Sequence, residues 1–224
     1  MKERPIIFSG PMVRAILENR KSQTRRVIEP QPSGKRHTLG KCTKGLAKSH
    51  LNRLSLFFEG ASLGNGKFLT DHILSPYGDI GDRLWVRETW KPVMVRGDQA
   101  LIKHKATPDD SKEVAIGGSA PNLTRRGWRP SIHMPRWASR INLEITGVRV
   151  ERVQEIGEAD AIAEGIYKHF DDDDDGPVWG WRSGMGYVGP PINAFRALWD
   201  SINAKRGFGW DANPWVWVLE FKRV

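Results

Sequence analysis

The chain of 224 residues lacks several features that define common protein classes. Its single cysteine, Cys42, excludes an intramolecular disulfide and a thiolate metal cluster within this chain. No apolar run approaches the roughly 18 residues that a membrane-spanning helix needs. The apolar segment that follows the charged start MKER is too short for a secretory signal. We therefore expect a cytoplasmic protein that does not engage a membrane.

Motifs for cofactors and metals are also missing. No Gly-rich phosphate loop follows a predicted strand, which argues against a dinucleotide-binding or P-loop fold. The six histidines are scattered and form neither H-x-H nor H-E-x-x-H. The five-aspartate run at 171–175 lacks the alternating ligands and the glycine of a calcium loop. This run is typical of a solvated acidic tip, or it could shield a basic groove. We expect neither a metal nor a cofactor.

Acidic residues are absent from the long stretch 30–58, although the same stretch contains Lys and Arg throughout. The net charge of the chain is +9. Excess positive charge attracts polyanions through counterion release, so the composition favours RNA or a nucleotide as partner, with DNA as an alternative. A second basic cluster surrounds Trp128 and consists of Arg125, Arg126 and Arg129. The Trp128 ring could stack on a base.

Hydrophobic patterns predict a mostly β protein with flanking helices, in the α+β class. The predicted strands are IIF near the N-terminus, the end of 81–90, VMV, ALIKHK, 141–153 and the final PWVWVLEFKRV. Helices are predicted at about 10–19, 157–165 and 191–207. The last helix has one apolar face, made by Ile192, Phe195, Leu198, Trp199 and Ile202.

The strand at 141–153 changes its apolar phase at Gly147. Such a change at a glycine is typical of a β-bulge, which bends a strand around a barrel corner. Short bulged strands without βαβ alternation predict a small, mostly antiparallel β-barrel decorated with helices.

The length fits one elaborated domain, so we expect a single domain over residues 1–224 with three insertions. The first, at about 31–66, is rich in Gly, Ser, Lys and Asn and is expected to be flexible unless it is bound to something. The second, at about 106–130, is expected to be rich in loops. The third, at about 168–190, contains the aspartate run and a Gly/Trp-rich stretch.

The segment LENRKSQTRRVIEP places Lys21 and Thr24 three residues apart after the first predicted helix. In a tight turn their ammonium and hydroxyl groups can approach one another. A desolvated lysine near other cations loses proton affinity and can serve as general base for a hydroxyl nucleophile. Arg20, Arg25 and Arg26 would supply these cations, or would hold phosphate. The alternative interpretation is a polar helix exit without chemistry.

Glu164 lies in the last turn of the second predicted helix, directly before Gly165. The helix dipole disfavours a carboxylate at this end. A buried cation such as Lys21 would compensate, although an exposed glutamate would also be tolerated.

The segment WRPSIHMPRWASRI (128–141) combines hydrogen-bond donors with prolines and tryptophans. Such a stiffened segment could form the wall of a pocket for a base or nucleotide, or it could be a well-packed loop. The candidate binding residues here and on the strand GDRLWVRETW are Trp85, Arg129, Ser131, His133, Arg136 and Trp137.

Three motifs, in this order, resemble the ASCH superfamily, whose fold is a PUA-like β-barrel associated with RNA. The first helix plus NRKSQTRR is similar to the family's G-x-K-x-x-T signature, and GDRLWVRE to its G-D-x-L-x-V strand. ITGVRVERVQEIGEADAIAEGI, followed by WVWVLEFKRV, resembles its strand–helix–final-strand ending. MPRWASRI is similar to the larger phage- or prophage-encoded members. The resemblance covers roughly half of the chain.

Small bacterial amidohydrolases of this family deacetylate N4-acetylcytidine with a Lys, a Thr and a Glu. The motifs map these residues onto Lys21, Thr24 and Glu164. The resemblance thus implies that Lys21 is a general base and Thr24 a nucleophile that attacks an acyl carbonyl. Glu164 would orient or protonate.

The chain also departs from this pattern. Asn19 stands where the family often has Gly, and the chain is about twice the size of the compact enzymes, without counterparts there for its basic and aspartate-rich insertions. Two alternatives therefore stay open. One is a non-catalytic module that binds RNA or DNA and reads a modified base. The other is a ribonuclease that uses Lys21 with a hydroxyl or with His133. The sequence does not indicate an oligomeric state.

Overall fold

A five-stranded sheet forms the centre of the fold. The computed structural model describes residues 1–32, 37–41, 54–62, 68–96, 98–116, 127–170, 177–182 and 185–224. The central strands, in spatial order, are β1 (Glu3–Ile7), β6 (Arg83–Arg87), β10 (Asn142–Arg152), β13 (Trp215–Arg223) and β2 (Gln23–Val27). β1 and β6 are parallel, and the other neighbours are antiparallel. The mostly β, α+β class is confirmed, whereas closure of the sheet into a barrel stays a prediction.

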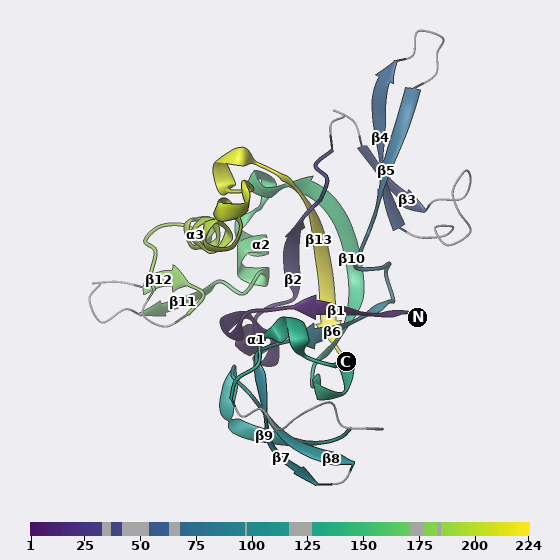
Figure 1. Ribbon diagram of the computed structural model, residues 1–224. Coiled ribbons are helices and arrows are strands. Elements are labelled where there is room, and N and C mark those ends of the chain that lie inside the picture. Colours follow the sequence, from purple (N-terminus) through teal and green to yellow (C-terminus); the bar gives the residue numbers. More distant parts are fainter. Residues whose placement is uncertain are drawn as a thin grey trace.

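β10 bends between its two neighbours. Its first residues pair with β6, and the residues after Gly147 pair only with β13. The register shifts between Ile145 and Gly147, so the bulge predicted from the sequence is confirmed. A Cβ atom on Gly147 would lie 2.6 Å from Glu220 Oε2 and would push that carboxylate aside. Figure 1 shows β10 as a curved ribbon, with β1 and β6 crossing the direction of β13 and β2.

Three α-helices accompany the sheet: α1 (Gly10–Leu17), α2 (Glu158–Ala163) and α3 (Pro191–Asn203). Short 3₁₀ turns are η2 (Ser131–His133), η3 (Arg136–Ala138), η4 (Val153–Glu155), η5 (Ala204–Arg206) and η6 (Trp210–Ala212). α2 packs against both β2 and α3, and Figure 1 shows both helices beside β2. The predicted apolar face of α3 is buried at Phe195, Leu198 and Trp199, but Ile202 is 53% exposed and lines a pocket described below.

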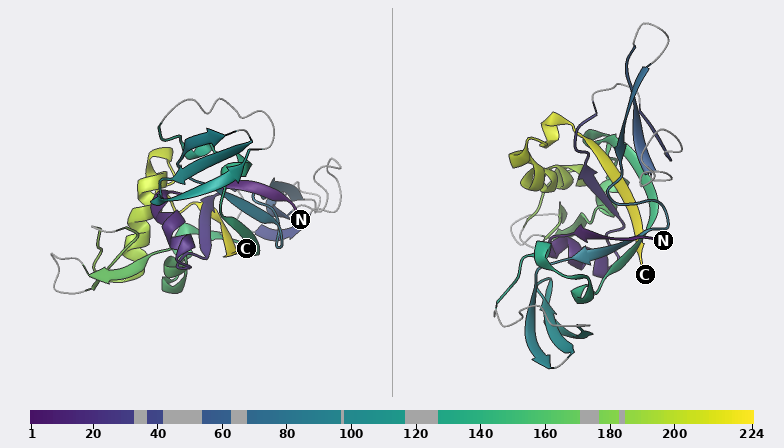
Figure 2. Two further views of the ribbon diagram at one scale, coloured as in Figure 1. Left: turned by 90° about the horizontal axis from the view of Figure 1, so that it is seen from below. Right: turned by 45° about the vertical axis from the view of Figure 1, so that its right-hand side comes forward.

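Three smaller β units are attached to this centre. One sheet consists of β3 (His37–Lys41), β4 (Leu54–Ser62) and β5 (Phe68–Leu74). Another consists of β7 (Trp90–Arg96), β8 (Gln99–His104) and β9 (Thr107–Ala115). β11 (Tyr167–Phe170) and β12 (Pro177–Gly180) form a hairpin. Figures 1 and 2 show the first two sheets at opposite ends of the molecule.

The insertions expected from the sequence correspond in part to these units. The prediction that 106–130 is rich in loops is wrong for 107–115, which forms β9. Most of the β9 side chains are polar and exposed, so the strand has no alternating apolar pattern to reveal it. The same unit begins earlier than expected, at Trp90. Cys42, Arg125, Arg126 and the aspartate run lie outside the described residues.

Within the described ranges, no helix has both the length and the apolar character that crossing a membrane would require.

Candidate active site

Lys21 is placed by the way in which α1 ends. Asn19 adopts a left-handed conformation with φ of 57°. The N–H of Asn19 donates to the Ile16 carbonyl at 3.1 Å, and the N–H of Arg20 to the Ala15 carbonyl at 2.8 Å, which together form a Schellman turn. Asparagine tolerates this conformation better than most residues. Asn19 can therefore make the turn that glycine would make at this position, and Lys21 follows directly.

Glu164 is placed by an equivalent turn at the end of α2. Glu164 caps this helix, and the next residue, Gly165, has φ of 99°. The N–H of Ile166 donates to the Ala161 carbonyl at 3.3 Å. A Cβ atom on Gly165 would lie 3.2 Å from the Ala15 Cβ atom and 3.4 Å from the Lys21 Cβ atom, so a larger residue would press against the end of α1. The two helix ends thus meet in close contact.

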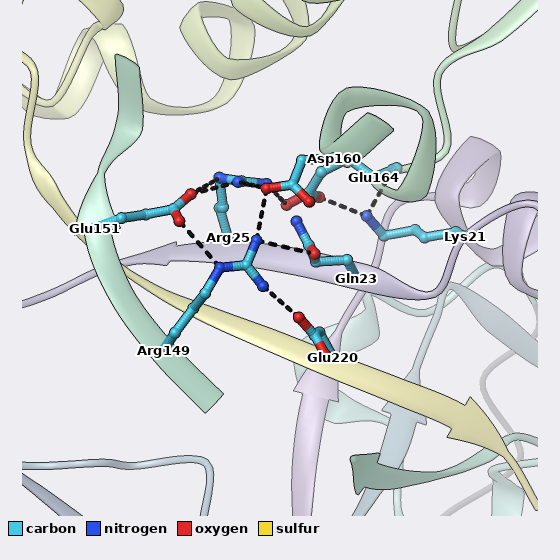
Figure 3. Close-up of polar contacts among 8 residues, drawn as sticks. All are labelled: Lys21, Gln23, Arg25, Arg149, Glu151, Asp160, Glu164 and Glu220. Atoms are coloured by element: carbon cyan, nitrogen blue, oxygen red, sulfur yellow. Dashed lines mark hydrogen bonds and ion pairs between the residues drawn. The ribbon is translucent and has the colours of Figure 1, made fainter. Parts of the chain in front are cut away.

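Lys21 and Glu164 form a buried ion pair at this meeting point. Lys21 Nζ donates to Glu164 Oε2 at 2.7 Å and to the Glu164 backbone oxygen, also at 2.7 Å. The two side chains are 1% and 5% exposed. A cation therefore compensates both the carboxylate and the negative helix end, and the contact expected from the sequence is confirmed. Figure 3 shows Lys21 pointing at Glu164.

The proton affinity of Lys21 is reduced by its surroundings. Burial lowers the pKa of the Lys21 ammonium below its usual range, because the charged form loses its hydration. The charge and hydrogen bond of Glu164 act in the opposite direction, and the nearby Arg26 and Arg25 guanidiniums add to the lowering. The neutral amine is therefore reached at a lower pH than in free lysine.

A pocket of about 510 Å³ lies beside this pair, and Lys21, Thr24 and Glu164 all line it. Thr24 is buried within β2 and pairs with Leu219 of β13, so it lies in a strand and not in the expected exit loop. In the part of the chain that the structure describes, the Thr24 hydroxyl makes no hydrogen bond. The three residues carried over from the family pattern thus share one cavity.

The pocket walls combine rings with a few polar groups. Rings that line it belong to Phe8, Tyr77, Phe195 and Trp199. Polar and charged groups come from Ser9, Arg26, Glu29, Thr89, Ser131, Asn203 and Arg206. Such a mixture is typical of small-molecule sites, in which apolar walls provide affinity and a few polar groups fix orientation.

Arg26 gives the pocket a half-buried cation. One of its NH2 groups donates to the Ile7 carbonyl at 2.6 Å, and the guanidinium lies 5.1 Å from the Phe8 ring centroid. Burial lowers the pKa of Arg26 and raises the pKa of Tyr77. Among the described residues, no carboxylate lies within ion-pair distance of Arg26. Its charge is therefore available to an anion or a carbonyl oxygen in the pocket.

Arg25 has no such freedom. Its side chain is fully buried and contacts three carboxylates: Glu151 Oε1 at 2.9 Å, Asp160 Oδ2 at 2.7 Å and Glu164 Oε1 at 3.3 Å. These contacts agree with the predicted influence of Arg25 on Lys21 and do not agree with a role in holding phosphate. Arg20 does not line the pocket: it pairs with Glu18 and lies 4.4 Å from the Tyr167 ring centroid.

Of the segment 128–141, Ser131 lines the pocket. His133 is exposed and lies outside the pocket lining. Arg136 pairs with Glu3 at 2.9 Å. Trp137 packs edge-on against the Trp90 ring, with 5.5 Å between centroids. These contacts show that much of the segment packs as an ordered loop, which was the second interpretation of its sequence.

Two further candidates also lie away from the pocket. The Arg129 guanidinium lies 5.2 Å from the Trp90 ring centroid. Trp85 is buried beneath the guanidiniums of Arg87, at 4.7 Å, and Arg136, at 5.9 Å. Trp85 therefore stacks on residues of the chain itself.

Sequence reasoning missed most of the pocket wall. Trp199 and Phe195 were expected on the apolar face of their helix, but a periodic pattern does not distinguish a core from a cavity. Arg206 pairs with Glu29 at the pocket, a contact between residues 177 positions apart that no local signal predicts. Asp160 and Glu151 lie within motifs noted in the sequence, but nothing there indicated that they would surround Arg25.

Among the described residues, no group of three or more His, Cys, Asp or Glu side chains is arranged to hold a metal ion. Comparison with protein-family models, with curated proteins and with solved structures finds no match for this chain. A function is therefore inferred from the pocket and from the sequence motifs.

Proposed function

We propose that this chain is an ASCH-type protein with a PUA-like fold that hydrolyses an amide on an N-acylated pyrimidine of the N4-acetylcytidine type. The observation that carries the proposal is the 2.7 Å pair between Lys21 and Glu164 in the wall of a pocket that also contains Thr24. The bulge that lets β10 pair with both β6 and β13 supports the PUA-like part, because barrel strands bend in this way.

The chemistry follows from the state of Lys21. In its neutral form, which burial favours, Lys21 removes the proton of the Thr24 hydroxyl, and the Thr24 oxygen attacks the acyl carbonyl. The carbon–nitrogen bond breaks, and Lys21 returns the proton to the departing base nitrogen. The acyl group is then an ester on Thr24, and water hydrolyses it to the carboxylic acid and regenerates the hydroxyl.

Glu164 orients Lys21 in this scheme and does not act as the acid. Lys21 holds Oε2 of Glu164, and Arg25 holds Oε1. Both carboxylate oxygens of Glu164 thus accept hydrogen bonds from side chains of the chain itself, which suits a residue that orients Lys21. Of the two roles that the family resemblance left open, orientation is therefore the one that the contacts support.

The pocket dimensions and walls suit a nucleobase. A volume of about 510 Å³ lies within the range of roughly 300–1,000 Å³ that is common for small-molecule sites. The aromatic rings can stack on a pyrimidine, and Arg26 can donate to a carbonyl or phosphate oxygen. The partner can be a free nucleoside or a base within RNA or DNA.

Acetate release from N4-acetylcytidine tests the proposal. We expect release by the wild-type protein and its loss in Lys21→Met, Thr24→Val and Glu164→Gln, each checked for folding by circular dichroism. Arg136→Lys is a control, because Arg136 pairs with Glu3 and does not line the pocket. A folded wild-type protein that releases no more acetate than buffer would exclude this activity.

A non-catalytic reader is the second candidate. Within the described part of the chain, both hydrogen bonds of the Lys21 ammonium go to Glu164, so in its charged form the lysine is already occupied. An aromatic pocket with Arg26 would then suffice to recognise a base. Binding of an acetylated oligonucleotide without acetate release would favour this function. The form of the ribonuclease alternative that uses His133 loses support, because His133 does not line the pocket, whereas the form that uses Lys21 with a hydroxyl stays a prediction.

A further inference from the structure

We propose that Arg25, fixed by Glu151 and Asp160, is a positioning residue that holds Glu164 in the orientation in which it engages Lys21. The inference rests on the proposed function for its kinetic consequence, but the geometry can be tested without activity. We call Arg25, Glu151 and Asp160 the clamp.

The clamp joins three elements that are distant in sequence. Arg25 comes from β2, Glu151 from β10, and Asp160 from α2, one helical turn before Glu164. Arg25 Nε and one NH2 group face Glu151, the same NH2 group reaches Asp160 at 2.7 Å, and the other NH2 group reaches Glu164 Oε1 at 3.3 Å. Figure 3 shows the Arg25 guanidinium between these carboxylates.

Glu164 needs a second partner because Lys21 occupies one side of its carboxylate. With its side chain 5% exposed, Glu164 has little access to water, so Oε1 would be left unpaired without Arg25. An unpaired buried carboxylate oxygen favours rotation of the side chain toward solvent. Such a rotation would remove the group that fixes Lys21.

An arginine suits this position better than a lysine. Its planar guanidinium directs several N–H groups to fixed places at once, and here it serves three carboxylates. An ammonium at the end of a flexible stem would keep the charge and would lose this geometry. The difference allows the charge of Arg25 to be separated experimentally from its positioning effect.

The rest of the clamp is itself fixed. Burial alone would raise the pKa of Asp160, but the hydrogen bonds and charges of Arg25 and Arg149 outweigh it and hold the pKa below its usual range. Arg149 contacts Asp160 at 2.6 Å and Glu151 at 3.0 Å from the side away from Lys21. Both carboxylates that hold Arg25 thus have a second cation, which restricts their movement.

Arg25→Lys is the decisive variant, and Arg140→Lys is its matched control. Arg140 forms a buried ion pair with Glu88 that has no part in the pocket. The readouts are kcat and KM for N4-acetylcytidine, and the titration midpoint of Lys21 followed by NMR of its labelled ε-carbon. The charged groups that face Lys21 are Glu164, Arg25 and Arg26.

We expect Arg25→Lys to lower kcat by about 100-fold, as a displacement of about 1 Å can do, with KM changed by less than about threefold. The Lys21 midpoint should fall, because the cation is kept while Glu164 leaves the lysine. Glu164→Gln should move the midpoint in the same direction and calibrates the effect. Arg140→Lys should change neither readout, even if it lowers thermal stability.

Asp160→Asn is the second variant and covers the case in which Arg25→Lys does not fold. It acts on Glu164 only through Arg25, so we expect smaller changes in the same direction. A folded Arg25→Lys or Asp160→Asn protein with wild-type kcat and an unmoved Lys21 midpoint overturns the clamp. If the wild-type protein is inactive but the midpoint falls as described, the hydrolase proposal fails and the clamp stands.

Discussion

Two buried ion pairs lie in different parts of this molecule and have different surroundings. The pocket pair is Lys21 with Glu164, and the distal pair is Arg140 with Glu88. Arg140 holds Glu88 through two contacts, 2.9 Å and 3.2 Å long, and also donates to the Thr107 hydroxyl at 2.7 Å. The glutamate side chains of the two pairs are similarly buried, at 5% and 2% exposed.

The two pairs differ chemically in their cations, which are a lysine at the pocket and an arginine in the distal pair. An arginine keeps its proton at any pH that the protein tolerates, so the distal pair can only hold β9 and its neighbours together. A buried lysine can lose its proton, and this lysine borders an open cavity. Buried ion pairs contribute little net stability compared with apolar packing. A lysine at the pocket therefore suits chemistry, whereas an arginine suits a permanent contact.

Replacement of each cation by methionine should separate the two pairs most strongly. Lys21→Met removes the general base, so we expect acetate release to fall by about 1,000-fold. Arg140→Met should leave the rate per folded molecule within about twofold, because the distal pair does not line the pocket. Single-turnover assays on purified, folded protein measure both. Equal losses of activity in the two variants would contradict the assignment of a catalytic role to the pocket pair alone.

The free energy of unfolding should change in the opposite order, with the larger loss in Arg140→Met and the smaller loss in Lys21→Met. Arg140→Met leaves Glu88 buried without its bidentate partner, which costs about 3–5 kcal/mol in comparable cases. Lys21→Met should cost less, because Glu164 still has Arg25 at 3.3 Å. Urea unfolding at neutral pH gives both values. A larger loss in Lys21→Met would show that Arg25 does not support Glu164.

The pH dependence should also distinguish the pairs. If neutral Lys21 is the base, kcat/KM rises with pH through the lowered pKa of Lys21. Glu164→Gln removes the charge that raises this pKa, so the titration midpoint of Lys21, followed by NMR, should move to lower pH in that variant. Arg26→Gln removes a charge that lowers this pKa, so the rising limb of kcat/KM should move to higher pH. Arg140→Lys, in the distal pair, should not move the limb.

Folding stability follows the same titration. The unfolded chain binds more protons at Lys21 than the folded chain does at a pH between the two pKa values. Stability should therefore rise as the pH increases through the folded pKa toward that of free lysine. Lys21→Met should flatten this rise and Arg140→Met should not, as measured by urea unfolding at several pH values.

The smallest expected effect concerns the turn that places Lys21. Asn19 is exposed and left-handed, so Asn19→Gly should change stability by no more than about 0.5 kcal/mol. Asn19→Val should cost about 1–2 kcal/mol, because a branched side chain is strained there. It should lower the activity as well, since Lys21 follows the turn. An Asn19→Val variant with wild-type stability and activity would show that the turn does not position Lys21.

The sequence was sufficient for the features that depend on local pattern. α1, the bulge at Gly147 and the final strand follow from periodicity and glycine position. The contact between Lys21 and Glu164 was expected because a carboxylate at a helix end needs a cation. The catalytic role of these residues stays a proposal.

The remaining features depend on contacts between distant residues. Arg25 meets Glu151 and Glu164 across 126 and 139 positions, and neither distance leaves a periodic signal. β9 escaped prediction because its polar side chains are mostly exposed. From the sequence, Arg25 was expected either to lower the proton affinity of Lys21 or to hold phosphate. Only the three carboxylates around its guanidinium distinguish these two roles.

The pairing of β2 with β13 has a consequence for biosynthesis. β2 carries Thr24 and Arg25, and its described strand neighbour, β13, is the last strand of the fold to be translated. A ribosome-bound chain that has already exposed Lys21 and Glu164 still lacks the strand against which β2 aligns. The pocket can therefore be completed only after β13 has left the ribosome, so the nascent chain should stay inactive as long as β13 is inside the exit tunnel.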